Sequence, residues 1–172
     1  TEEVQRALKK KNIEESTPVQ AGCIPPMREW KDVIAKAPTG TGKTFAFGIP
    51  IIEHIEPGSE ETEAVILAPT RELAMRDLCV YLPGVRIVCL YGGAPIGKQI
   101  DALKKHPQIV VATPGRLSDH MKRRTVKLDN VKTVVLDEAD RMLDMGFLPA
   151  VRRIVRETPA ERQTLLFSAT LD

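Results

Sequence analysis

The sequence predicts an α/β domain with a mainly parallel central sheet and helices on both faces. Six short runs rich in Val, Ile and Leu show little polar alternation, which is typical of strands covered on both faces. Segments of roughly ten residues with helical character separate most of these runs, as βαβ units require. Gly, Thr, Arg and acidic residues follow the runs, at the strand ends where such sheets bind ligands. The six runs are Val33–Ala37, Ala64–Ala68, Arg86–Tyr91, Ile109–Ala112, Thr133–Leu136 and Thr164–Phe167.

Two helices are expected before the first run. The segment Glu2 to Lys11 carries apolar residues at helical spacing. Thr17 then has the character of an N-cap, with Pro18 at the first helical position and Gln20 three residues after the cap. This second helix is expected to end before Pro25-Pro26. Two interpretations of Gln20 remain open: one half of a capping box with Thr17, or bidentate recognition of an adenine edge.

A glycine-rich segment, Ala37-Pro38-Thr39-Gly40-Thr41-Gly42-Lys43-Thr44, follows the first run and precedes an apolar stretch from Phe45 to Ile55. A strand, a turn ending in Gly-Lys-Thr and a helix together indicate a phosphate-binding loop. Its glycines let successive N–H groups point into one concavity, and the helix adds the positive end of its dipole. Lys43 would then lie near the β- and γ-phosphates, and the Thr44 hydroxyl would reach Mg²⁺. The alternative is a glycine turn that caps an ordinary helix.

Asp137 and Glu138 follow the fifth run. A carboxylate at the end of an apolar strand holds Mg²⁺ in many nucleotide sites, and the next acid can orient or deprotonate an attacking water. The alternative is that both acids cap the next helix. The phosphate loop upstream favours the metal interpretation. It requires Lys43 and Asp137 to lie side by side in one pocket.

Glycine and polar residues follow the other runs, and each has an ordinary interpretation as well. Thr113 suits an N-cap before Pro114, Arg71 and Arg116 suit a solvated surface, and Gly92-Gly93 suits a plain turn. The segments are Pro69–Ala74, Gly92-Gly93 with Gln99 six residues later, Thr113–Arg116 and Ser168–Thr170.

Composition is that of an ordinary globular domain. The 172 residues are 42% apolar and 28% charged, with a net charge of +2, so any nucleic-acid surface must be local. No run approaches the roughly 20 apolar residues that span a bilayer. Three Cys without C-x-x-C spacing and three scattered His argue against a zinc site. We expect a monomer with reduced thiols, no membrane partner and a cytoplasmic location, or a nuclear one if the source is eukaryotic.

Taken in order, these segments resemble the N-terminal RecA-like domain of a DEAD-box ATP-dependent RNA helicase, from Asn12 to Thr170. The resemblance implies a RecA-like P-loop NTPase fold for residues 1–172, with 1–36 as a helical entry that carries an adenine-reading motif. It also implies ATP and Mg²⁺ as ligands and the RNA sugar–phosphate backbone as partner, contacted without reading sequence.

The resemblance assigns roles to individual residues. Thr17 and Gln20 would read adenine, and the triphosphate would lie against Ala37, Pro38, Thr39, Gly40, Thr41, Gly42, Lys43 and Thr44. The catalytic residues would be Lys43, Asp137 and Glu138, with Mg²⁺ held by Thr44 and Asp137. The RNA groove would contain Pro69, Thr70, Arg71, Gly93, Thr113, Gly115 and Arg116. Asp140, Ser168 and Thr170 would couple nucleotide state to strand separation.

The chain departs from the family pattern outside the phosphate and acid positions. Asn12 and Ile13 stand where the family has Gly and an aromatic that stacks on the base, so stacking should be weaker. Ser16 replaces a proline, Arg76 stands where Gln is usual, and the family's aromatic residue upstream of the first helix is absent.

The family's second RecA-like domain, with its arginine fingers, is absent from these 172 residues. We therefore expect weak nucleotide binding, very slow turnover and no duplex unwinding by this chain alone. The leading hypothesis is the ATP-binding domain of an ATP-dependent RNA helicase. There are two alternative hypotheses. One is an RNA clamp or adaptor in which ATP only switches the affinity for RNA. The other is a DNA-directed P-loop ATPase, and the presence of Gln20 argues against it.

Overall fold

Six parallel strands form one sheet in the computed structural model, which describes residues 2–10, 15–38, 42–70 and 84–171. The strand order is β1-β6-β5-β2-β4-β3, and every pairing between these described strands is parallel. The predicted parallel sheet is therefore confirmed, and each strand matches one apolar run to within one residue at either end. The strands are β1 Val33–Lys36, β2 Ala64–Leu67, β3 Ile87–Leu90, β4 Ile109–Ala112, β5 Thr133–Leu136 and β6 Gln163–Ser168.

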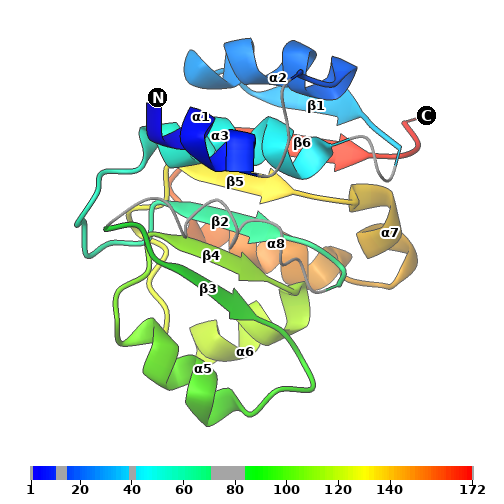
Figure 1. Cartoon of the computed structure of the whole chain (residues 1–172). Helices are drawn as coiled ribbons and strands as arrows, with labels where there is room; N and C mark the ends of the chain where they lie inside the picture. The colour runs from blue at the N-terminus through cyan, green and yellow to red at the C-terminus, as the bar shows by residue number, and fades with distance from the viewer. Residues whose placement is uncertain (1, 11–14, 39–41, 71–83, 172) are drawn as a thin grey trace.

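Helices cover both faces of the sheet, as Figure 1 shows. Alternate strand residues supply the two cores: Ala64 and Ile66 pack on one side, Val65 and Leu67 on the other. None of the described helices has the length and apolarity that a bilayer crossing requires. The helices on the first face are α1 Glu2–Lys10, α2 Pro18–Arg28 and α3 Lys43–His54; those on the second are α5 Ile96–Leu103, α6 Pro114–Lys122, α7 Ala139–Asp144 and α8 Leu148–Glu157.

The predicted end of the second helix was wrong. Helix α2 continues through Pro25 and Pro26 to Arg28, although each proline removes a backbone donor. Cys23 and Met27, on either side of the prolines, are buried in the core that α2 shares with α3. Burial of this face outweighs the local cost, because tertiary packing supplies most of the stability of a short helix.

Strand register brings all six carboxyl ends to one edge of the sheet. Lys36 pairs with Ser168, and Leu67 pairs with both Ala112 and Leu136. In Figure 1 the six arrows point the same way, so the loops that follow them gather along this edge. The loops that carry the predicted site residues are therefore neighbours in space.

Candidate functional site

The glycine-rich segment connects β1 to the N-terminus of α3. Gly42 precedes the helix in a left-handed conformation with φ of 76°, and Lys43 is the first helical residue. Glycine adopts this conformation without the steric cost that a side chain would add. The buried Ala37 donates its N–H to the Ser168 carbonyl at 2.9 Å, which ties the start of the loop to the end of β6. Thr39, Gly40 and Thr41 lie outside the described residues.

Lys43 contacts both acids that follow β5. Its Nζ lies 3.1 Å from Asp137 Oδ1 and 3.6 Å from Glu138 Oε1, which confirms the predicted proximity of Lys43 and Asp137. Lys43 is 7% exposed and Asp137 is 2% exposed, so this ion pair is largely shielded from water. Carboxylate and hydroxyl oxygens from Asp137 and the half-buried Thr44 are the hard ligands that Mg²⁺ prefers. The donor set at this end of the sheet therefore fits a magnesium-bound triphosphate.

Glu138 has an unusual backbone conformation, with φ of 51° and ψ of 50°. It occupies the N-cap position of α7, but its side chain makes no capping hydrogen bond. The carboxylate instead contacts Lys43 and, at 3.4 Å, Arg141 Nη1. A non-glycine residue in the left-handed region costs of order 1 kcal/mol and is found preferentially at functional sites. The alternative interpretation as a helix cap is therefore wrong for the Glu138 side chain.

Gln20 forms the capping box and also contacts the glycine-rich loop. Its Oε1 accepts from the Thr17 N–H at 2.9 Å, and its own N–H donates to Thr17 Oγ1 at 3.4 Å. Its Nε2 donates to the Gly42 carbonyl at 3.1 Å. A Cβ on Gly42 would lie 2.7 Å from that Nε2. The capping-box interpretation is confirmed, while adenine recognition by Gln20 stays a prediction.

Three residues predicted to couple the sites form a connected group at the ends of β5 and β6. Thr170 Oγ1 donates to Asp140 Oδ2 at 3.0 Å, and Ser168 Oγ donates to the Thr170 carbonyl at 2.5 Å. Burial alone would raise the pKa of Asp140, but hydrogen bonds from Thr170, the Arg141 N–H and Ser168 lower it overall. Asp140 is therefore ionised at neutral pH and holds Thr170 beside α7.

The residues predicted to contact RNA lie at the other half of the same edge. Pro69 and Thr70 follow β2, Gly93 follows β3, and Thr113, Gly115 and Arg116 lie at the start of α6. Thr113 occupies the N-cap position, yet its side chain makes no capping hydrogen bond. Arg116 Nη1 donates to the Ala94 carbonyl at 2.9 Å and to Gln99 Oε1 at 3.2 Å. Arg71 lies outside the described residues, as do Asn12, Ile13 and Arg76.

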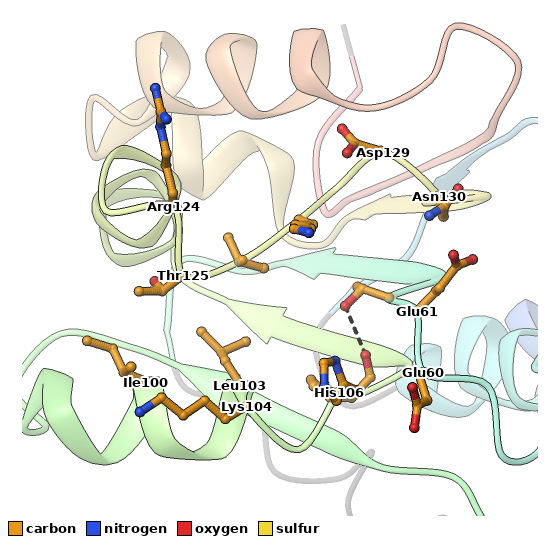
Figure 2. Close-up of a pocket in the computed structure, with 14 residues that line it drawn as sticks. Glu60, Glu61, Ile100, Leu103, Lys104, His106, Arg124, Thr125, Asp129 and Asn130 are labelled. Atoms are coloured by element: carbon orange, nitrogen blue, oxygen red, sulfur yellow. Dashed lines mark hydrogen bonds between the residues drawn. The ribbon is translucent and has the colours of Figure 1, made fainter.

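A cavity of about 670 Å³ opens at the opposite end of the strands, and Figure 2 shows its lining. Glu60 and Glu61 precede β2, His106 precedes β4, and Asp129 and Asn130 precede β5. None of the predicted site residues lines it. The chemistry predicted from the sequence therefore lies at the carboxyl edge and not in this cavity.

Removing the Lys43 charge is expected to destabilise the nucleotide-free chain. Lys43→Met would remove the buried ammonium that contacts Asp137, at a cost of about 3–5 kcal/mol. Urea unfolding of the wild type, Lys43→Met, Asp137→Asn and the double variant measures this cost and the coupling between the two residues.

The Arg123–Asp119 pair is a matched control, because its N–O distance is also 3.1 Å but its side chains are 52% and 43% exposed. Arg123→Met should change the free energy of unfolding by less than about 1 kcal/mol. Equal losses for Lys43→Met and Arg123→Met would contradict the burial argument.

Comparison with known proteins places this geometry in a family. The family model described as "DEAD/DEAH box helicase" matches residues 17–172. The chain is 55% identical, over 96% of its length, to "ATP-dependent RNA helicase CshA" of Limosilactobacillus reuteri, and 53% identical, over 99%, to the protein of that name from Listeria monocytogenes. It spans only 34% of the length of each of these two relatives.

A solved structure shows the same fold. The crystal structure of a DEAD box protein from Methanococcus jannaschii superposes with a TM-score of 0.90 at 40% identity. The match covers 100% of this chain and 48% of that one. The RecA-like fold that the resemblance implied is therefore confirmed.

Proposed function

The chain belongs to the DEAD/DEAH box helicase family, and on this basis we propose that it is the ATP-binding domain of an ATP-dependent RNA helicase. Residues 1–172 form one RecA-like domain in this proposal, with 1–36 as its helical entry, and a second RecA-like domain of the same parent completes the enzyme. The observation that carries the proposal is the contact between Lys43 and Asp137 at the carboxyl edge of a parallel sheet.

The nucleotide occupies the end of the edge formed by β1, β6 and β5. The segment from Ala37 to Thr44 surrounds the triphosphate, where the N-terminus of α3 favours negative charge. Thr17 and Gln20 lie beside this loop, because Gln20 donates to Gly42, and they contact the adenine. Thr44 and Asp137 hold Mg²⁺, which offsets charge on the phosphate oxygens when it is bound.

ATP hydrolysis requires a positioned water and stabilisation of the developing negative charge. Glu138 orients or deprotonates that water, since its carboxylate lies 3.6 Å from the Lys43 ammonium in the same pocket. Lys43 donates to the β- and γ-phosphates. Its ammonium lies between two carboxylates in this structure, so nucleotide binding requires it to exchange part of that contact for phosphate oxygens.

RNA occupies the other end of the edge, at β2, β4 and β3. Backbone contact there needs a few N–H groups, hydroxyls and arginines and no base-specific groups, which suits a chain with net charge of only +2. Asp140, Ser168 and Thr170 lie at the ends of β5 and β6, on the nucleotide half, and β5 is the neighbour of β2 in the sheet. In this proposal they pass a change in the nucleotide pocket to the RNA residues.

Competition binding tests this proposal. A fluorescent ATP analogue bound to the parent protein should be displaced by ATP at a concentration at least about tenfold lower than GTP requires, because Gln20 reads the adenine edge. Single-stranded RNA should stimulate ATP turnover more than DNA of the same sequence, because the 2′-hydroxyl distinguishes them. Equal displacement by GTP, or equal stimulation by DNA, would favour a DNA-directed or general P-loop ATPase instead.

A further inference from the structure

A chain of hydrogen bonds between buried side chains lies directly behind Arg116. Gln99, on α5, is 6% exposed, and His120, on α6, is fully buried. Together they connect Arg116 to the Tyr91–Ala94 turn after β3 and to Thr125 after α6. The nucleotide chemistry proposed above uses neither residue.

The contacts of Gln99 determine how its amide is oriented. Its nitrogen, Nε2, donates to the Tyr91 carbonyl at 2.9 Å, because a carbonyl can only accept. Its oxygen, Oε1, therefore points the other way and accepts from Arg116 Nη1 at 3.2 Å. The same oxygen lies 2.9 Å from His120 Nε2, so that ring nitrogen must carry the proton of this hydrogen bond.

The other ring nitrogen of His120 faces Thr125. Burial, followed by the positive charge of Arg116, lowers the pKa of His120; Asp119 opposes the shift and Arg123 adds to it. The ring is therefore neutral at pH 7, with its proton on Nε2. His120 Nδ1 then accepts from the Thr125 hydroxyl, whose oxygen lies 2.7 Å away. The Thr125 hydroxyl also lies 3.1 Å from the His120 carbonyl, a second acceptor for its one proton, whereas the proton between His120 Nε2 and Gln99 Oε1 has one position.

We propose that Gln99 and His120 are positioning residues for the RNA groove, which hold the Arg116 guanidinium in one fixed arrangement against the Gly93 turn. Gln99 binds the turn through Tyr91 and binds Arg116 directly, while His120 holds the Gln99 amide in the orientation that does both. An arginine loses rotamer freedom when it is fixed, so an arginine that is already fixed before RNA arrives binds it more tightly. A guanidinium has five N–H donors, and the two contacts here use those of Nη1. The proposal rests on the proposed RNA-binding role of Arg116.

Two substitutions of His120 separate positioning from packing. A glutamine amide nitrogen reaches about as far from the backbone as His Nε2, whereas an asparagine amide reaches only as far as Nδ1. His120→Gln therefore keeps a donor to Gln99, and His120→Asn loses it. In the parent protein, His120→Asn should raise the RNA concentration for half-maximal ATPase stimulation about fivefold, the usual effect of one neutral hydrogen bond. The maximal rate and the KM for ATP should stay unchanged, and His120→Gln should stay within about twofold of wild type.

A double variant tests the route through Arg116. If His120 acts through Arg116, adding His120→Asn to Arg116→Ala should not weaken RNA binding further. An additional fivefold loss in the Arg116→Ala background would overturn the proposal, as would equal RNA affinity for His120→Asn and wild type. If Arg116→Ala alone has no effect on RNA binding, then it is the proposed role of Arg116 that fails.

Nitrogen NMR of wild-type His120 provides a measurement that needs no variant. The proposal requires a neutral ring protonated on Nε2 at pH 7. A ring protonated on Nδ1, or on both nitrogens, would contradict it. Circular dichroism melting of each variant shows whether a loss of RNA affinity accompanies a loss of fold.

Discussion

Joining this chain to the second RecA-like domain of its parent is expected to raise ATP turnover about 10³-fold or more in the presence of RNA. Arginine fingers contribute about 10³–10⁵ in rate in related phosphoryl-transfer systems, because they offset charge that develops on the γ-phosphate. In the described part of this chain, Lys43 on α3 contacts Asp137 and one oxygen of the Glu138 carboxylate, and Arg141 contacts the other Glu138 oxygen. In the proposed function, the further cations that stabilise the transition state come from the second domain.

Single-turnover and steady-state ATPase assays of the 172-residue chain and of the two-domain protein measure this ratio. Nucleotide affinity is the control, since both proteins contain the Lys43–Asp137 pocket. The affinity for ATP should differ far less between the 172-residue chain and the two-domain protein than the turnover rate does. A chain that reaches turnover within about tenfold of the two-domain protein would contradict the prediction.

Glu138→Gln is expected to lower ATP turnover of the two-domain protein by about 10²–10⁴, the usual contribution of a general base. Glutamine has the same shape but cannot take a proton from the attacking water. Glu138 is held in a left-handed conformation with its carboxylate 3.6 Å from the Lys43 ammonium, so the substitution leaves the pocket outline in place. The Kd for ATP should change only a few-fold, because the loss falls on the transition state.

Glu161→Gln, at an exposed glutamate before β6, is the control and should leave turnover unchanged. Glu138→Gln also distinguishes the enzyme from the alternative function, an RNA clamp that ATP binding switches. A clamp that is locked on ATP should still support its cellular role, whereas an enzyme should lose it. Unchanged turnover in Glu138→Gln would remove Glu138 from the catalytic residues.

The strands and the acid pocket were predictable because their signals are local. In runs such as Val65 to Leu67, the residues that face either side of the strand are all apolar. This pattern is typical of a strand that is covered on both faces. Carboxyl ends of parallel strands meet at one edge, so a lysine after β1 and an aspartate after β5 were expected to be neighbours. Their contact at 3.1 Å confirms this.

The errors and omissions have a common cause. Helix α2 continues past Pro25 because Met27 is buried against residues that are distant in the sequence. Local helix propensity does not take that burial into account. The contact between Gln20 and Gly42 joins segments 22 residues apart, and the contact between His120 and Gln99 joins segments 21 apart. Glu138 has a left-handed backbone although nothing in its neighbours' identities requires one. Each feature depends on a partner that approaches only when the chain has folded.

The amino-acid sequence by itself indicated which loops carry the candidate site residues, since those residues follow each strand run directly. Only the tertiary structure decided their order along the sheet edge. In the sheet, β6 and then β5 follow β1, and β2, β4 and β3 lie beyond them. The residues proposed for nucleotide thus form one half of the edge and those proposed for RNA the other. Strand order depends on how the two cores pack, and a linear pattern does not encode that.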